Sequence, residues 1–170
     1  MDHQFHKEFV KHALYRMDEN LRMIGICLNR LTEEQIWMKP NGSTNSVGNL
    51  LLHLCGNITQ YAISSLDHRP DHRRREEEFS SRHKGDKAQL LAGLEEVVKE
   101  AQTVLKRSSE ENLLAIRQVQ GYSFSGIGNV LHVVEHFSYH TGQIALYTKL
   151  LQNNDLGFYD GVDLNNKNKD

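Results

Sequence analysis

The sequence predicts an all-α protein built as a four-helix bundle, on three observations. Apolar residues recur every three or four positions over four long stretches of the chain. Only two prolines occur in 170 residues, and both lie between those stretches. Polar segments with turn and capping residues separate the stretches. Four amphipathic helices of this length bury their apolar stripes by packing around one core.

The first predicted helix covers residues 5–31, and the second covers residues 47–66. The apolar stripe of the first helix consists of Phe5, Phe9, Ala13, Met17, Leu21, Ile24, Leu28 and Leu31. The polar segment 32–46, which contains the turn sequence Pro-Asn-Gly, ends this pattern. Either Asn45 or Ser46 can cap the second helix, because both have a short side chain that accepts a hydrogen bond from the first turn.

A long charged connection, residues 67–86, leads to a third predicted helix over residues 87–106. Its arginines are followed directly by three glutamates, so we interpret it as a solvated crossover and not as a surface for nucleic acid. A fourth helix is predicted over residues 126–151. The short first link makes the first two helices antiparallel neighbours, and the long crossover between helices 2 and 3 permits an up-down-down-up order.

Length and composition limit the classes of protein to which the chain can belong. With 38% hydrophobic and 25% charged residues, we expect one domain over residues 1–152 and a polar C-terminal tail over residues 153–170. The net charge of −2 argues against a nucleic-acid partner. No signal peptide and no run of 18 apolar residues is visible, so we expect a cytoplasmic protein with no membrane partner.

Three histidines spaced four apart on the fourth helix, His132, His136 and His140, are the main candidates for chemistry. Residues at this spacing lie ~40° apart around a helix and ~6 Å apart along it, so two neighbouring imidazoles can bind one ion. The outer two lie ~12 Å apart along the axis, so all three do not easily share an ion. A further ligand must come from another helix, and His53 lies at the edge of the second helix's apolar stripe.

The pattern alone leaves two interpretations of these histidines open. A single histidine at the boundary between core and surface is more often a hydrogen-bonded structural residue than a metal ligand. The chain also contains ten histidines, so pairs at this spacing arise by chance. A metal site would instead combine His53 with one neighbouring pair from the last helix.

Two short motifs, SVGNLLLHL in the second helix and EHFSYHTGQI in the fourth, resemble the signature of the DinB-like family of small four-helix bundles. The residues that match this signature are His53, His136, His140, Gln143 and Ile144. The resemblance covers residues 5–152. It implies an up-down-down-up bundle that binds a divalent metal ion, zinc or nickel among others, through its three histidines, and that often forms a homodimer.

Two other polar residues of the fourth helix stand beside this signature. His132 falls outside the ligand pattern, and we interpret it as an outer residue near the pocket. Gln143 is a candidate for a residue that supports a ligand or lines the pocket, and a place on the helix surface is the alternative.

The resemblance also implies a class of chemistry, since relatives with an assigned activity include bacillithiol S-transferases and mycothiol-dependent isomerases. Three histidines leave a zinc ion with one open position, where a water molecule or a low-molecular-weight thiol becomes acidic. We therefore expect a metal-dependent enzyme, either an S-transferase or a hydrolase, that acts on a small-molecule substrate. The ligands do not decide between the two reactions, and no catalytic side chain is assigned. The alternative is a non-catalytic metal-binding stress or structural protein.

Overall fold

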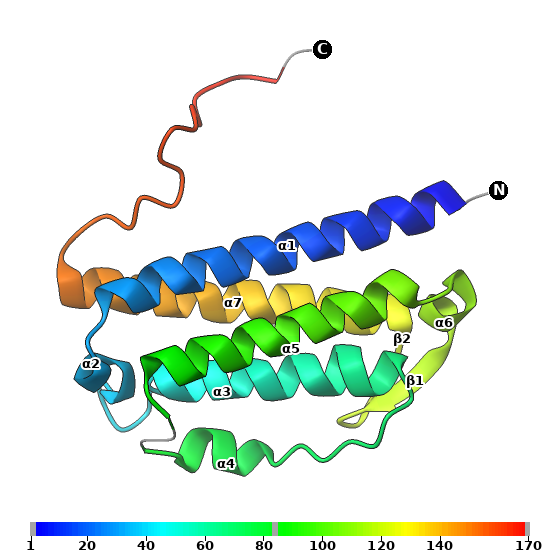
Figure 1. Ribbon diagram of the computed structural model, residues 1–170, viewed down its shortest axis with the longest axis horizontal. Coiled ribbons are helices and arrows are strands. Elements are labelled where there is room, and N and C mark those ends of the chain that lie inside the picture. The colour runs from blue at the N-terminus through cyan, green and yellow to red at the C-terminus, as the bar shows by residue number, and fades with distance from the viewer. Residues whose placement is uncertain (1–2, 83–84, 169–170) are drawn as a thin grey trace.

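The computed structural model describes residues 3–82 and 85–168, and most of its regular structure is helical, as expected. Four long helical segments dominate it (Figure 1). These segments are α1 (His3–Arg30), α3 (Val47–Ile58) with its continuation η1 (Thr59–Ser64), α5 (Lys87–Arg107) and α7 (Gly126–Gln152). Each of them falls on one of the stretches in which apolar residues recur at the helical period.

The long helices pack on one another through their apolar faces. α1 contacts α5 and α7, and α3 contacts the same two helices. All four contribute large side chains that are fully buried: Met17, Ile24, Leu28, Leu51, Leu54, Ile58, Tyr61, Leu94, Leu105 and Phe137. Burial of these side chains supplies the main favourable free energy of folding.

The start of α3 is fixed by a reciprocal cap that also holds the crossover. Of the two capping residues considered, Ser46 is the cap: its hydroxyl accepts a hydrogen bond from the Asn49 backbone, and the Asn49 side chain accepts one from the Ser46 backbone. The Asn49 amide nitrogen then donates to the carbonyl groups of Glu78 and Ser81, at 2.9 and 2.8 Å. The first turn of α3 therefore anchors the segment that follows α3 and η1.

The end of the second long segment is a π-helix, η1, and not a regular α-helix. Such wide turns are rare, and they occur often at functional sites. Tyr61 lies in this turn and is buried, and its hydroxyl donates a 3.1 Å hydrogen bond to the side chain of Gln120.

Short elements occupy the segments that the sequence pattern treats only as links: α2 (Glu33–Trp37), α4 (Arg75–Ser80), α6 (Glu110–Leu114), β1 (Ile116–Val119) and β2 (Tyr122–Ser125). The short helices have five or six residues, which is too few to display a helical period. The two strands form an antiparallel hairpin. Its turn residues, Gln120 and Gly121, both have positive φ, and a Gln-Gly pair is a weaker hairpin signal than Asn-Gly or Asp-Gly.

The segment after α7 contacts the first helix. Arg30 donates hydrogen bonds to the carbonyl groups of Asp155 and Leu156, and Arg22 donates one to that of Phe158. The Leu156 side chain is buried. Within residues 3–82 and 85–168, no helix has the length and apolar character needed to cross a bilayer.

Close packing at Gly48 predicts a marked effect of a single methyl group. A Cβ atom added at Gly48 would lie 2.8 Å from the ring of Trp37, the only tryptophan of the chain. We expect Gly48→Ala to lower the free energy of unfolding in urea and to shift the tryptophan emission. Gly93→Ala on α5 is the matched control, because nothing lies within 4 Å of its Cβ, and it should stabilise the protein by about 0.5–1 kcal/mol. Equal effects of the two substitutions would contradict the packing.

Candidate metal centre

Three of the histidines singled out in the sequence meet between α3 and α7. The His136 Nε2 atom lies 2.8 Å from Nε2 of His53 and 3.1 Å from Nε2 of His140. One nitrogen from each ring lies within 4.8 Å of the other two. His53 and His140 are buried, and His136 is partly exposed. The residues proposed as ligands from the sequence are therefore neighbours in space, although 83 residues separate His53 from His136.

The ring of His53 is oriented by a buried carboxylate. Its Nδ1 atom lies 2.8 Å from Oε2 of Glu78. Burial raises the pKa of Glu78, but hydrogen bonds from His53 and Arg73 outweigh this effect and hold the pKa below its ordinary value. The ionised carboxylate can only accept, so Nδ1 of His53 carries the hydrogen. In the neutral ring, Nε2 then presents its lone pair toward the other histidines.

A buried arginine holds this carboxylate from the other side. Arg73 donates from Nε to Oε1 of Glu78 at 2.7 Å and from Nη2 to Oε2 at 2.9 Å, which is the two-pronged geometry that arginine favours with carboxylates. Its third nitrogen donates to the side chain of Gln60 at 2.8 Å. The side chains of Arg73 and Glu78 are only 4% and 10% exposed. The interpretation of the charged crossover as solvated is therefore wrong for these two residues.

A glycine of α3 makes room for the carboxylate. A Cβ atom added at Gly56 would lie 2.0 Å from Oε1 of Glu78 and 2.9 Å from Nε of Arg73. Any larger residue at this position would displace both groups. Gly56 therefore allows the crossover to lie directly on the helix that carries His53.

The ring of His140 is oriented in a similar way by a residue of its own helix. Its Nδ1 atom donates to the side-chain oxygen of Gln143 at 2.8 Å. The Nε2 atom of His140 consequently also presents a lone pair. Gln143 is thus the supporting residue that the sequence suggested, and its side chain is not simply a polar group on the helix surface.

The arrangement of the three nitrogens is better explained by a shared cation than by hydrogen bonds among the rings. Two lone pairs, from His53 and His140, face Nε2 of His136, which can carry only one hydrogen. At most one of the two close contacts is therefore a hydrogen bond. Ligand nitrogens around a tetrahedral zinc ion lie about 3.3 Å apart, which follows from Zn–N distances near 2.0–2.1 Å. The two separations from His136, 2.8 and 3.1 Å, are within about 0.5 Å of this value, and all three nitrogens lie within 4.8 Å of one another, so the donor set is compatible with such an ion.

The histidines of α7 are neutral at neutral pH. Burial, followed by the neighbouring His140 and His53, lowers the pKa of His136 to about 3. Burial also lowers the pKa values of His140 and His132. Because a metal binds the neutral ring, an ion would not have to displace a proton from these residues at pH 7.

His132 lies beside the three histidines and is not part of the group. Its ring stacks on Tyr61 with centroids 4.0 Å apart, and its Nε2 atom lies 3.1 Å from the amide nitrogen of Asn57. The Asn57 side-chain oxygen is buried, and within the described part of the chain it has no hydrogen-bond partner. Side-chain contacts of α7 with α3 therefore continue past the three histidines and extend to Tyr61 of η1.

The crossover supplies the groups that sequence reasoning missed. Glu78 orients His53, Arg73 orients Glu78, and the ring of Phe79 lies 4.7 Å from that of His53. One general rule could have pointed to such a residue in the sequence: a histidine that binds a metal needs an acceptor for the hydrogen on its second nitrogen. It could not select Glu78, because Glu76, Glu77 and Glu78 are consecutive and only the last is buried.

The orientation of His53 predicts the effect of neutralising its acceptor. We expect Glu78→Gln to weaken zinc binding about 10- to 100-fold, because an amide holds the Nδ1 hydrogen less well than a carboxylate. Competition with a chromophoric chelator would measure the affinity, and circular dichroism would monitor the fold. Glu77→Gln is the matched control, because the Glu77 side chain is exposed and forms an ion pair with Arg74 at the surface. Unchanged affinity in Glu78→Gln would contradict the orienting role, and Gly56→Ala should reproduce the loss by displacing Glu78.

The low pKa of His136 predicts acid sensitivity of the metal-free protein. Between pH 6.5 and about 3 the unfolded chain binds a proton at His136 and the folded chain does not. The free energy of unfolding should therefore be independent of this group above pH 6.5 and should fall as the pH is lowered below that value. Urea unfolding of chelator-treated protein should show a smaller fall in His136→Gln than in the native chain, whereas the exposed His12→Gln should behave like the native chain. Parallel curves for all three would contradict the pKa shift.

Comparison with known proteins places this chain in a family. The model of the family described as a protein of unknown function, DUF1572, matches residues 4–159. No curated protein matches the sequence. Two crystal structures have a similar fold at 16% sequence identity: a conserved protein from Enterococcus faecalis and a DinB-like protein from Bacillus subtilis.

The alignments with these two structures extend over nearly the whole of each chain. The Enterococcus faecalis protein has a TM-score of 0.72, with 85% of this chain and 97% of that chain covered. The Bacillus subtilis protein has a TM-score of 0.64, with 87% and 94% covered. The likeness to DinB-like proteins is thereby confirmed at the level of the fold. Because the family model matches most of its length, the chain belongs to the DUF1572 family.

Proposed function

We propose that this protein is a metal-dependent enzyme. It holds one divalent metal ion, zinc or nickel, through His53, His136 and His140. The reaction is an S-transfer or a hydrolysis on a small-molecule substrate, with a low-molecular-weight thiol or a water molecule as the attacking group. The observation that carries the proposal is the convergence of three imidazole nitrogens. Hydrogen bonds to Glu78 and Gln143 keep two of these nitrogens, those of His53 and His140, unprotonated with their lone pairs available.

The residues of the chain and the ion have separate tasks in this proposal. When bound, the ion supplies a Lewis acid with an open coordination position, which lowers the pKa of a water molecule or a thiol. Glu78 and Gln143 hold the rings of His53 and His140 in one orientation, so little reorganisation is needed on binding. Arg73 neutralises the charge of Glu78, which keeps that carboxylate in place behind the ring.

The cysteines of the chain do not supply the attacking thiol. Burial, followed by the charge of Glu78, raises the pKa of Cys55 to about 12, and burial also raises the pKa of Cys27. Both thiols are therefore protonated at neutral pH and are poor nucleophiles. Any thiol chemistry at this site must use a thiol that arrives from solution.

We further propose that residues 1–152 form a single four-helix bundle with up-down-down-up order and that residues 153–170 are a tail. The contacts of α1 and α3 with both α5 and α7 support this order, as does the long crossover that returns the chain to the start of α5 (Figure 1). We also propose a homodimer. Its support is the exposed apolar surface of the first and last long helices, where Phe5 and Leu131 are 69% and 56% exposed.

Metal content is the first test of this proposal. We expect about one zinc or nickel ion per chain, measured by elemental analysis after incubation with each metal and removal of excess. His53→Ala and His136→Ala should lose the ion and keep the helical circular dichroism spectrum. His12→Ala, an exposed histidine of α1, is the control and should retain it. A native protein that binds no zinc, nickel or manganese would overturn the ligand assignment.

The loaded protein then separates an enzyme from a binding protein. Turnover of an electrophile with bacillithiol or cysteine, or hydrolysis of an ester, should require the metal and should disappear in His53→Ala. One ion per chain without turnover in either assay would favour the non-catalytic alternative.

A further inference from the structure

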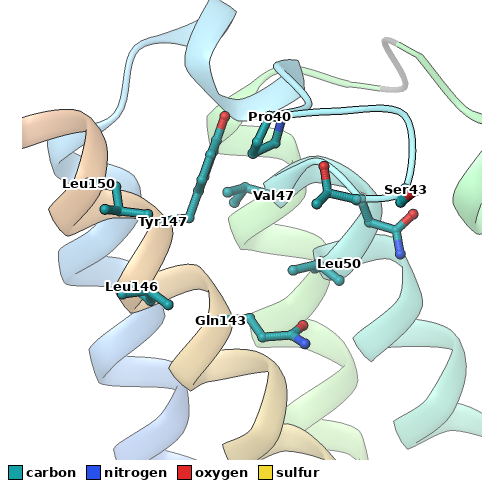
Figure 2. A pocket seen from close by; sticks show the side chains of 10 residues that line it. Pro40, Ser43, Val47, Leu50, Gln143, Leu146, Tyr147 and Leu150 are labelled. Carbon is teal, nitrogen blue, oxygen red and sulfur yellow. The ribbon is translucent and has the colours of Figure 1, made fainter.

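A pocket of about 320 Å³ lies between α3, α7 and the segment that precedes α3, and one of its lining residues, Gln143, accepts the hydrogen bond from His140. Much of the lining is apolar, and Figure 2 shows four aliphatic side chains in it: Val47 and Leu50 from α3, and Leu146 and Leu150 from α7. Ser43 and Thr44 also line the pocket, and the Thr44 hydroxyl donates a hydrogen bond to the carbonyl of Asn41. A volume of this size lies at the lower end of the range for small-molecule pockets.

On both helices, residues that line the pocket lie one turn from a histidine of the candidate metal centre. Leu50 lies one turn before His53, and Gln143 lies one turn after His140, which corresponds to ~4.5 Å along each axis. Gln143 belongs to both sites, because it lines the pocket and its oxygen accepts the hydrogen bond from His140. In Figure 2 the Gln143 amide lies at the end of the pocket, below Leu50.

The residues that line the pocket favour an uncharged part of a ligand. None of the described residues that line the pocket carries a charge at neutral pH. Leu146 and Leu150 are 61% and 72% exposed, so apolar surface faces solvent where a ligand can cover it. The hydroxyl of Tyr147 already donates to the carbonyl of Met38, so it closes the wall and is not directed at a ligand.

We propose that this pocket binds the uncharged apolar part, aliphatic or aromatic, of a small-molecule substrate whose reacting group lies at the three histidines. The proposal rests on the metal site proposed above and adds to it a substrate class. Leu50 and Leu146 are the residues that select the apolar group, because they face each other from α3 and α7 across the groove (Figure 2). Gln143 lies at the junction between the apolar group and the reacting group.

Hydroxamates of different tail length test this proposal, because the head group chelates zinc and only the tail reaches a neighbouring pocket. The probes are acetohydroxamate and octanoylhydroxamate, and the readout is calorimetric affinity for the zinc-loaded protein. The visible spectrum of the cobalt-substituted protein reports contact of the head group with the metal. We expect octanoylhydroxamate to bind at least about tenfold more tightly, because burial of roughly two of its six additional methylene groups suffices for that factor.

Substitution of single leucines by glutamate tests whether the octanoyl tail binds in this pocket. Leu146→Glu should remove at least most of the tenfold gain of the octanoyl probe and leave acetohydroxamate affinity unchanged. Leu131→Glu is the matched control, since it is an exposed leucine of the same helix outside this pocket, and it should preserve the gain. Leu146 is itself exposed, so its replacement should not prevent folding.

The remaining outcomes separate failure of the pocket from failure of the metal site. Equal affinity of the two hydroxamates, with a cobalt spectrum that responds to both, would overturn the pocket and leave the metal site intact. A gain that persists in Leu146→Glu, or that Leu131→Glu also removes, would overturn the pocket as well. A dimer that dissociates in Leu146→Glu, without any tail effect in the native protein, would assign this surface to a second copy of the chain. A cobalt spectrum that responds to neither probe would overturn both proposals.

Discussion

The hydrogen bond between the buried carboxylate of Glu78 and the ring of His53 is the contact on which the rest of the site depends. A charged group at this depth is stable only if it is paired, and Arg73 provides the pair. The pair in turn requires a helix surface without a side chain, which Gly56 provides. Four residues from α3 and the crossover, His53, Gly56, Arg73 and Glu78, are thus in direct contact with one another or separated only by the space that Gly56 leaves open.

The packed helices and the crossover contribute different parts of the site. The two long helices α3 and α7 carry the histidines, and their packed core fixes the distance between the rings. In its described part, the crossover adds no residue to the three-histidine group, but Glu78 sets the tautomer of His53 and Phe79 lies beside that ring. The opposite end of the groove, near Gln143, is lined by apolar and uncharged polar groups. The three histidines therefore lie between a charged, buried side and an uncharged, open side.

The sequence was most informative where many residues contribute to one signal. Twenty or more residues at the helical period define each of α1, α5 and α7, so these helices were predictable almost to their ends. The grouping of His53, His136 and His140 in space was predictable because their spacing and a family resemblance agree. The hairpin was not, because its strands have four residues each and its Gln-Gly turn lacks a strong signal. Neither was the burial of Arg73 and Glu78, since a run of charges has the same pattern whether it is solvated or folded over a helix.

The location of Glu78 on α4 has a kinetic consequence. This helix has six residues, and the described residues on either side of it, 71–74 and 81–82, have no regular structure, so we expect it to open at a lower free-energy cost than the long helices that form the core. Such an opening withdraws the carboxylate and Arg73 from His53 while the remaining helices stay folded. An ion held by the three histidines would then exchange with solution at the frequency of this local opening, and global unfolding would not be required for its release.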